Sequence, residues 1–168
     1  MIEVYKNLFV GSTEDWKKLN DTSGWKILQV SHKIHQQTKG YTKGCNKDDP
    51  EYYYCIRDNR MILNIIDNDY LDNRYIDGII DTIQQGLKFI QDNIRKYKVL
   101  VHCDQGQSRS PTVALLYLIV YTSLYKEFND IEEIIMDFIK QKYPNYQPAG
   151  QMKRILERIY CNTLEKNT

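Results

Sequence analysis

The sequence predicts an α/β fold: a single three-layer domain over residues 1–168, in which helices flank a mostly parallel central sheet. Three observations favour this class. Short apolar runs alternate along the chain with longer segments whose apolar residues recur at helical spacing. The chain is long enough to bury a core and fits one domain. Near residue 100, a strand, a short polar loop and a helix follow one another.

The first half of the chain holds three expected strand regions. Val4–Ser12 is predicted as a strand pair or as a strand entering a turn. A short helix is expected at Glu14–Leu19, and Lys26–Ser31 is a strand whose apolar character indicates burial. Lys33–Tyr52 is polar and contains glycines, so it is predicted as the longest loop. Met61–Asp67 is the next strand, because its apolar residues alternate with polar or smaller ones.

The second half is predicted as helices around one strand. A helix over 73–95 has Asp72 as its expected N-cap and carries apolar residues every three or four positions. Lys98–Val101 is a short apolar strand, and Pro111–Leu118 belongs to a buried helix that starts on the far side of a polar loop. These three elements therefore form a strand, loop and helix in the order that α/β folds repeat.

Two further helices are predicted to close the chain. Asn129 and Glu132 predict a capping box for the first of them, and Pro144 is expected to end it. Pro148 precedes the last helix, whose apolar residues again recur at helical spacing.

Composition and charge disfavour several classes of function. The formal net charge is +1, so there is no strong electrostatic case for nucleic acid or an anionic membrane. No apolar run is long enough to span a bilayer, and we expect no membrane partner. The four cysteines form no CxxC pair and no cluster with histidines, so we expect neither a metal nor a cofactor. A working thiolate would fit a reducing, cytoplasmic location.

The segment His102–Ser110 is the most informative part of the chain. Cys103 stands at the end of a strand, a short polar loop follows, and a helix begins beyond it. Backbone N–H groups and the positive end of a helix dipole make such a turn an anion-binding site, and the same field favours a thiolate. Arg109 can hold two phosphate oxygens in a planar fork, and Gly106 permits a tight turn. The sequence therefore predicts a phosphate-binding loop.

This His-Cys-x5-Arg-Ser pattern resembles the signature of the cysteine-based protein tyrosine phosphatase superfamily, most closely its dual-specificity branch. The resemblance extends to the opening strand at Asn7–Ser12, the core strand at Ile27–Ser31 and the strand Leu63–Asp67 that delivers the catalytic acid. Tyr143–Asn145 resembles the closing segment less specifically. The weakest stretch is about 33–55.

The resemblance implies roles for the residues of the loop. Cys103 is the expected nucleophile, and Arg109 binds the phosphoryl oxygens. Ser110 stands where the family places a hydroxyl that helps the thiolate leave, although a plain N-cap is the competing interpretation. His102 is expected to hydrogen-bond backbone and to support the thiolate. The expected phosphate-binding residues are Asp104, Gln105, Gly106, Gln107, Ser108 and Arg109.

The leaving oxygen needs a proton, which the family takes from an aspartate some thirty-odd residues before the cysteine. Asp67, Asp69 and Asp72 are the candidates. Spacing alone favours Asp72, but that residue has a structural role as a helix cap. The apolar pattern before Asp67 matches the strand that carries the acid, so Asp67 is preferred and Asp69 comes next.

Two other residues bear on activity. Asp104 lies inside the loop, and its side chain is expected to point away while its carboxylate disfavours highly anionic ligands. Cys55 could trap an oxidised Cys103 as a disulfide, as a nearby cysteine does in some relatives.

The resemblance implies a metal-independent hydrolase of phosphotyrosine, and of phosphoserine or phosphothreonine in a shallow pocket, through a phosphocysteine. The expected partner is a phosphorylated protein. The alternatives are a phosphatase of RNA 5′ ends, phosphoinositide or phosphoglucan, or a phosphate-binding module without turnover.

Overall fold

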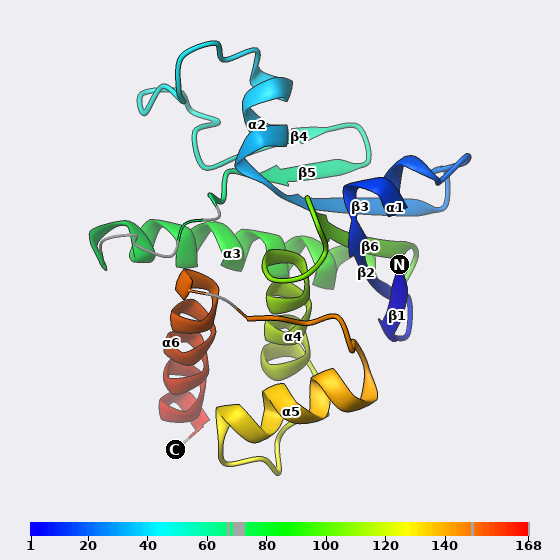
Figure 1. Ribbon diagram of the computed structural model, residues 1–168, viewed down its shortest axis with the longest axis vertical. Helices are drawn as coiled ribbons and strands as arrows, with labels where there is room; N and C mark the ends of the chain where they lie inside the picture. The colour runs from blue at the N-terminus through cyan, green and yellow to red at the C-terminus, as the bar shows by residue number, and fades with distance from the viewer. Residues whose placement is uncertain (67, 69–72, 149, 168) are drawn as a thin grey trace.

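The computed structural model describes residues 1–66, 68, 73–148 and 150–167 (Figure 1). Its strands are β1 (Ile2–Tyr5), β2 (Leu8–Ser12), β3 (Trp25–Val30), β4 (Tyr54–Arg57), β5 (Arg60–Leu63) and β6 (Lys98–Cys103). They form one sheet in the order β1-β2-β6-β3-β5-β4. The four central strands are parallel, and β1 and β4 add antiparallel edges. The predicted α/β class, with a mostly parallel sheet flanked by helices, is confirmed.

The predicted strands differ from the observed ones in two places. The strand expected to run to Asp67 ends at Leu63, because the backbone N–H of Ile65 turns back to the Leu63 carbonyl. The antiparallel edge strand β4 was not predicted, since its alternation is only four residues long. At the N-terminus, the predicted strand pair is the hairpin of β1 and β2, which turns at Asn7 with a φ of 64°.

In the described part of the chain, six helices accompany the sheet: α1 (Thr13–Lys17), α2 (His32–Lys39), α3 (Asn73–Asn93), α4 (Arg109–Tyr121), α5 (Ile131–Gln141) and α6 (Gly150–Asn167). The segment Lys33–Tyr52, predicted as a loop, begins with α2, because the Ser31 hydroxyl caps the helix and Gly40 ends it with a φ of 71°. The N-cap of α5 is Asp130, not Asn129, because the Asp130 side chain accepts from the N–H of Glu132. Asp72, the expected cap of α3, lies outside the described residues.

The two faces of the sheet carry different side chains. Val99, Val101 and Cys103 of β6 belong to the apolar core that α3 and α4 cover. Because side chains alternate along a strand, Leu100 and His102 face the opposite side. There Trp16 of α1 stacks on His102. In Figure 1, α3 to α6 lie on one side of the sheet and α2 lies on the other.

The carboxyl ends of the parallel strands gather the residues of the candidate site. Gly11 and Ser12 of β2 pair with His102 and Cys103 at the end of β6. Ser31 follows directly after β3 on the other flank of β6. In open α/β sheets, ligands bind outside this edge.

Candidate active site

The loop between β6 and α4 is held from outside, as an anion cradle requires. Its carbonyl oxygens accept hydrogen bonds from distant segments: Asp104 from the Thr13 N–H at 3.3 Å, Gly106 from the Tyr143 hydroxyl at 2.9 Å and Gln107 from the Gln147 N–H at 2.8 Å. Within the described residues, no hydrogen bond uses the backbone N–H groups of the four positions 105–108. The donors of the loop are therefore available to an anion.

Gly106 is required at the centre of this loop for two reasons. Its φ is 76°, a conformation that side chains disfavour. A Cβ atom there would also lie 2.9 Å from the backbone carbon and oxygen of Gly11. A side chain at this position would therefore collide with the end of β2.

Cys103 lies at the base of the loop with a polar partner. Its side chain is 2% exposed, and the hydroxyl of Ser110 lies 3.3 Å from the Cys103 sulfur and 3.1 Å from the Gly11 carbonyl oxygen. The N-cap of α4 is Ser108, so the N-cap interpretation of Ser110 is wrong. The Ser110 hydroxyl is positioned to donate to the sulfur.

His102 is held by side chains as a neutral ring. Arg60 donates to the Gln29 carboxamide oxygen at 3.4 Å, which orients the Gln29 amide group towards Nε2 of His102 at 2.8 Å. Nε2 then accepts, and Nδ1 carries the proton. Burial lowers the pKa of His102 to about 4, although its backbone hydrogen bond with Cys103 acts in the opposite direction. The ring is therefore neutral at neutral pH.

Asp104 and Ile65 help to hold Arg109 at the loop. Its Nη2 donates to Asp104 Oδ2 at 2.9 Å, and its Nη1 donates to the carbonyl oxygen of Ile65 at 3.2 Å. The Asp104 carboxylate also accepts from the Ser31 hydroxyl at 2.9 Å. Its side chain therefore points to Arg109 rather than away, which corrects the sequence-based expectation. Burial alone would raise the pKa of Asp104, but these hydrogen bonds outweigh burial and lower it.

The candidate acids Asp67, Asp69 and Asp72 lie outside the described residues. The chain just before them is described. The carbonyl oxygen of Ile65 accepts from Arg109, and that of Ile66 accepts from the Gln151 side chain. The segment that leads to the candidate acids is thus fixed beside Arg109.

Cys55 is too far from Cys103 for a direct disulfide. In the sheet register His102 lies opposite Gln29, Gln29 opposite Ile62 and Ile62 opposite Cys55. Three strand spacings place Cys55 about 14 Å from His102, whereas the Cα atoms of a disulfide lie within about 7 Å. Cys55 also shares the sheet face of His102, opposite to that of Cys103. The sequence-based suggestion of a Cys55–Cys103 disulfide is wrong.

Several residues that build the site were not predicted as site residues. Tyr143 reaches Gly106 from 37 positions away, and Trp16 reaches His102 in β6 from α1, so no local pattern indicates either contact. Gln29 carried a signal that sequence reasoning did not use: it is a polar residue inside an apolar, buried strand. Buried polar side chains need a partner, which here is His102.

The described part of the chain has neither a metal-binding cluster nor a membrane-spanning helix. No group of three His, Cys, Asp or Glu side chains there could hold a metal ion. No helix there is long and apolar enough to cross a bilayer. The four cysteines are free thiols.

Comparisons with known proteins agree on a family. The family described as "Dual specificity phosphatase, catalytic domain" matches residues 24–159. Mouse "Dual specificity protein phosphatase 2" is 32% identical over 97 residues, which are 54% of this chain. The match takes in 28% of that relative's own length, so this chain corresponds to a minor part of it.

Solved structures share the fold at low sequence identity. A leucine-rich-repeat and phosphatase-domain protein of Entamoeba histolytica has a TM-score of 0.66 at 14% identity, covering 99% of this chain and 94% of its own. The Yvh1 phosphatase domain of Chaetomium thermophilum has a TM-score of 0.66 at 19% identity, covering 99% and 98%. The human tyrosine phosphatase-like serine/threonine/tyrosine-interacting protein has a TM-score of 0.65 at 19% identity, covering 98% and 97%.

Proposed function

We propose a reaction for this chain on the premise that it belongs to the dual specificity phosphatase family, whose catalytic domain matches residues 24–159. The chain hydrolyses phosphotyrosine in proteins, and phosphoserine or phosphothreonine as well, through a phosphocysteine. One observation carries the proposal. Cys103, Arg109 and Ser110 lie together at a loop whose carbonyl oxygens accept hydrogen bonds from residues outside the loop. Four free thiols fit a reducing, cytoplasmic setting.

The first step transfers the phosphoryl group to sulfur. The Cys103 thiolate attacks phosphorus, the bond between phosphorus and the leaving oxygen breaks, and that oxygen takes a proton from the general acid. Arg109 and the backbone N–H groups of the loop bind the phosphoryl oxygens, where negative charge develops. Asp104 and the Ile65 carbonyl keep the guanidinium beside the loop before substrate arrives.

The second step regenerates the free enzyme. A water molecule attacks phosphorus and gives a proton to the carboxylate that the first step produced. The S–P bond then breaks, and its electron pair returns to sulfur. The hydroxyl of Ser110, 3.3 Å from the sulfur, donates to the departing thiolate. His102 remains neutral and takes no part as a base.

The nature of the loop favours a phosphoprotein substrate. Positions 104–108 contain no lysine, and Asp104 places a carboxylate beside Arg109. Both features disfavour ligands with several phosphate groups.

A panel of rate measurements tests this substrate preference. The substrates are p-nitrophenyl phosphate, matched phosphotyrosine and phosphothreonine peptides, a phosphoinositide, a phosphoglucan and a 5′-phosphorylated RNA. Highest kcat/KM on the peptides supports the proposal. Highest kcat/KM on another substrate, or binding without turnover, contradicts it.

Replacing Ser110 with alanine should slow the second step more than the first. Loss of one hydrogen bond to the developing thiolate is expected to cost about 10–100-fold in kcat. Phosphocysteine should then accumulate, and rapid-quench kinetics should show a burst of the alcohol product. Ser23→Ala is the matched control, because Ser23 is exposed in the turn before β3, with Asp21 as its hydrogen-bond partner. Equal losses in the two variants would contradict this role.

Replacing Asp67 with asparagine should slow turnover by about 10²–10⁴-fold on alkyl phosphates, whose leaving oxygen needs a proton. The loss should be smaller on activated aryl phosphates. The basic limb of the pH–rate profile should vanish, because that limb reports deprotonation of the acid.

Asp69→Asn and Asp72→Asn are the matched controls for this experiment. Asp72→Asn should leave chemistry nearly unchanged, because asparagine caps a helix about as well as aspartate. If one of these variants loses the basic limb and Asp67→Asn keeps it, the acid is that other residue.

A further inference from the structure

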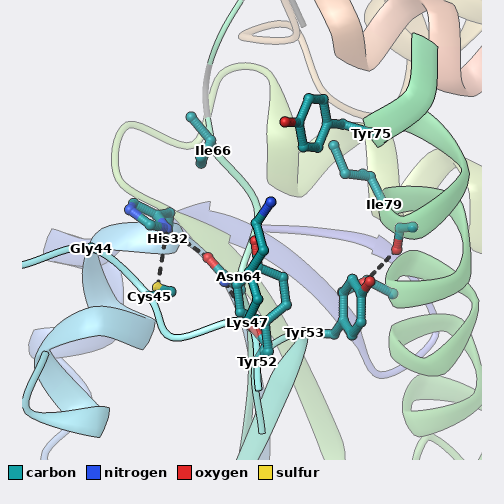
Figure 2. Close-up of a pocket in the computed structure, with 12 residues that line it drawn as sticks. His32, Gly44, Cys45, Lys47, Tyr52, Tyr53, Asn64, Ile66, Tyr75 and Ile79 are labelled. Carbon is teal, nitrogen blue, oxygen red and sulfur yellow. Dashed lines mark hydrogen bonds between the residues drawn. The ribbon is translucent and has the colours of Figure 1, made fainter. Parts of the chain in front are cut away.

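A cavity lies beside the chain that leaves β5, where the Ile65 carbonyl oxygen accepts from Arg109. It has a volume of about 580 Å³ and lies between the segment 41–53, helix α3 and the chain that leaves β5. Figure 2 shows Ile66 and His32 across from Tyr75 and Ile79, with Tyr52 and Tyr53 nearby. We call it the tyrosine pocket. Nothing in the proposed reaction uses it.

The tyrosine pocket begins one residue away from the groups that hold Arg109. The Ile65 carbonyl oxygen accepts from Arg109 Nη1 and also from the backbone N–H of His32 at 3.0 Å. Ile66 and His32 themselves line the pocket. When the phosphate of a substrate lies at Arg109, the parts of the substrate on either side of the phosphorylated residue are therefore within reach of this cavity.

The lining is mainly apolar and carries unusually exposed side chains. Tyr53 is 54% exposed, Ile66 42% and Tyr75 50%. Large apolar side chains gathered around one concave surface indicate a binding site. Lys47 brings an ammonium group to the lining, 5.7 Å from the centre of the Tyr75 ring. A lining with a single ammonium group suits an apolar ligand better than it suits a ligand with several phosphate groups.

The wall formed by segment 41–53 is held in place by charged groups. Glu51 accepts from Arg57 at 2.7 Å and from Lys39 at 2.6 Å, and Asp49 accepts from Lys39 and from Tyr41. The Arg57 bond lowers the pKa of Glu51 to about 2, and the Tyr41 bond lowers that of Asp49 to about 2. Depressed carboxyl pKa values stabilise the fold above the ordinary carboxyl range, and this stabilisation is lost only as the pH falls towards 2. The wall is therefore formed across neutral pH.

We propose that the tyrosine pocket binds an aromatic or large aliphatic side chain of the phosphorylated protein, within three positions of the phosphorylated residue. This inference rests on the proposed function and names part of its substrate. Residues of an extended peptide advance about 3.3 Å each, so a close neighbour of the phosphorylated residue reaches an adjoining pocket. The pocket thus selects substrates by a flanking apolar residue.

The test measures kcat/KM on phosphotyrosine peptides of one length, in which phenylalanine replaces serine at each of three positions on either side. Wild-type protein should favour phenylalanine by about tenfold at one position. Tyr75→Ala and Tyr53→Ala should each remove most of that preference. Both variants should keep wild-type kcat/KM on p-nitrophenyl phosphate, which has no flanking residue.

Tyr97→Ala is the matched control. Tyr97 is 37% exposed and carries Lys26 over its ring at 5.1 Å, so it resembles Tyr75 in setting but lies outside the pocket. The control should keep the phenylalanine preference. Loss of the phenylalanine preference in Tyr97→Ala would overturn the pocket assignment. Survival of that preference in both Tyr75→Ala and Tyr53→Ala would also overturn it.

Other outcomes separate this inference from the proposed function. Hydrolysis of all peptides at equal rates overturns the pocket and leaves the phosphatase intact. Loss of hydrolysis of a short-chain phosphoinositide, but not of peptides, in Tyr75→Ala would assign the pocket to a lipid and also overturn the proposal. No hydrolysis of any substrate by the wild-type protein refutes the proposed function itself.

Discussion

The Cys103→Ser protein should lose turnover by about 10⁴-fold or more, because a serine hydroxyl is not ionised near neutral pH. The fold should survive, since serine differs from cysteine by one atom and the site is stabilised by the surrounding loop rather than by the sulfur. Ser110 and the outward-bound carbonyls remain in place to support the loop. Phosphate-bearing ligands should therefore still bind.

Steady-state rates on p-nitrophenyl phosphate and calorimetric binding of a phosphotyrosine peptide measure the two halves of this prediction. Cys161→Ser is the matched control, because Cys161 is exposed on α6. Appreciable turnover by Cys103→Ser would refute the mechanism.

A chelator should leave the activity of the wild-type protein unchanged. A loss of activity in EDTA that a divalent ion restores would point to metal chemistry instead.

A second large effect is expected from Arg109→Lys, which should lower kcat/KM by about 10²–10³-fold. A guanidinium presents parallel N–H groups to two phosphoryl oxygens, whereas an ammonium is a single point charge. Lysine also lacks the two nitrogens that reach Asp104 and the Ile65 carbonyl at the same time. The side chain would then no longer be fixed beside the loop.

The loss should appear in both kcat and KM, because Arg109 is proposed to contact the phosphoryl group in the ground state and in the transition state. Arg95→Lys is the matched control: Arg95 is exposed in the turn that precedes β6, whereas the loop follows the other end of that strand. A variant with wild-type kcat/KM on peptides would show that phosphate binding depends on the backbone of the loop alone.

The catalytic loop could be predicted because its parts are close in sequence. Cys103, Gly106 and Arg109 lie on one strand, loop and helix, and the apolar pattern on either side identifies those elements. Helix α3 was predicted to within a few residues for a similar reason, since its apolar residues repeat over 21 positions. A long, regular repeat of apolar residues identifies a helix even where single residues depart from the repeat.

Short elements and helix caps were predicted less well. β4 and α2 are four and eight residues long, so too few apolar positions repeat within them to distinguish an element from a loop. The cap of α5 depends on which of Asn129 and Asp130 turns its side chain to the helix, and both residue types are good caps. The sequence alone does not decide between such neighbours.

The sequence by itself determined the class of fold and pointed to Cys103 and Arg109 as the proposed nucleophile and phosphate-binding residue, because strand, loop and helix are contiguous and their chemistry is local. Only the tertiary structure decided which way Asp104 points, what orients His102, that Cys55 is remote from Cys103, and that a tyrosine-lined cavity begins beside the Ile65 carbonyl that accepts from Arg109. Each of these depends on which strands become neighbours and which face a side chain takes. Those arrangements come from packing between segments distant in sequence, and no local pattern encodes them.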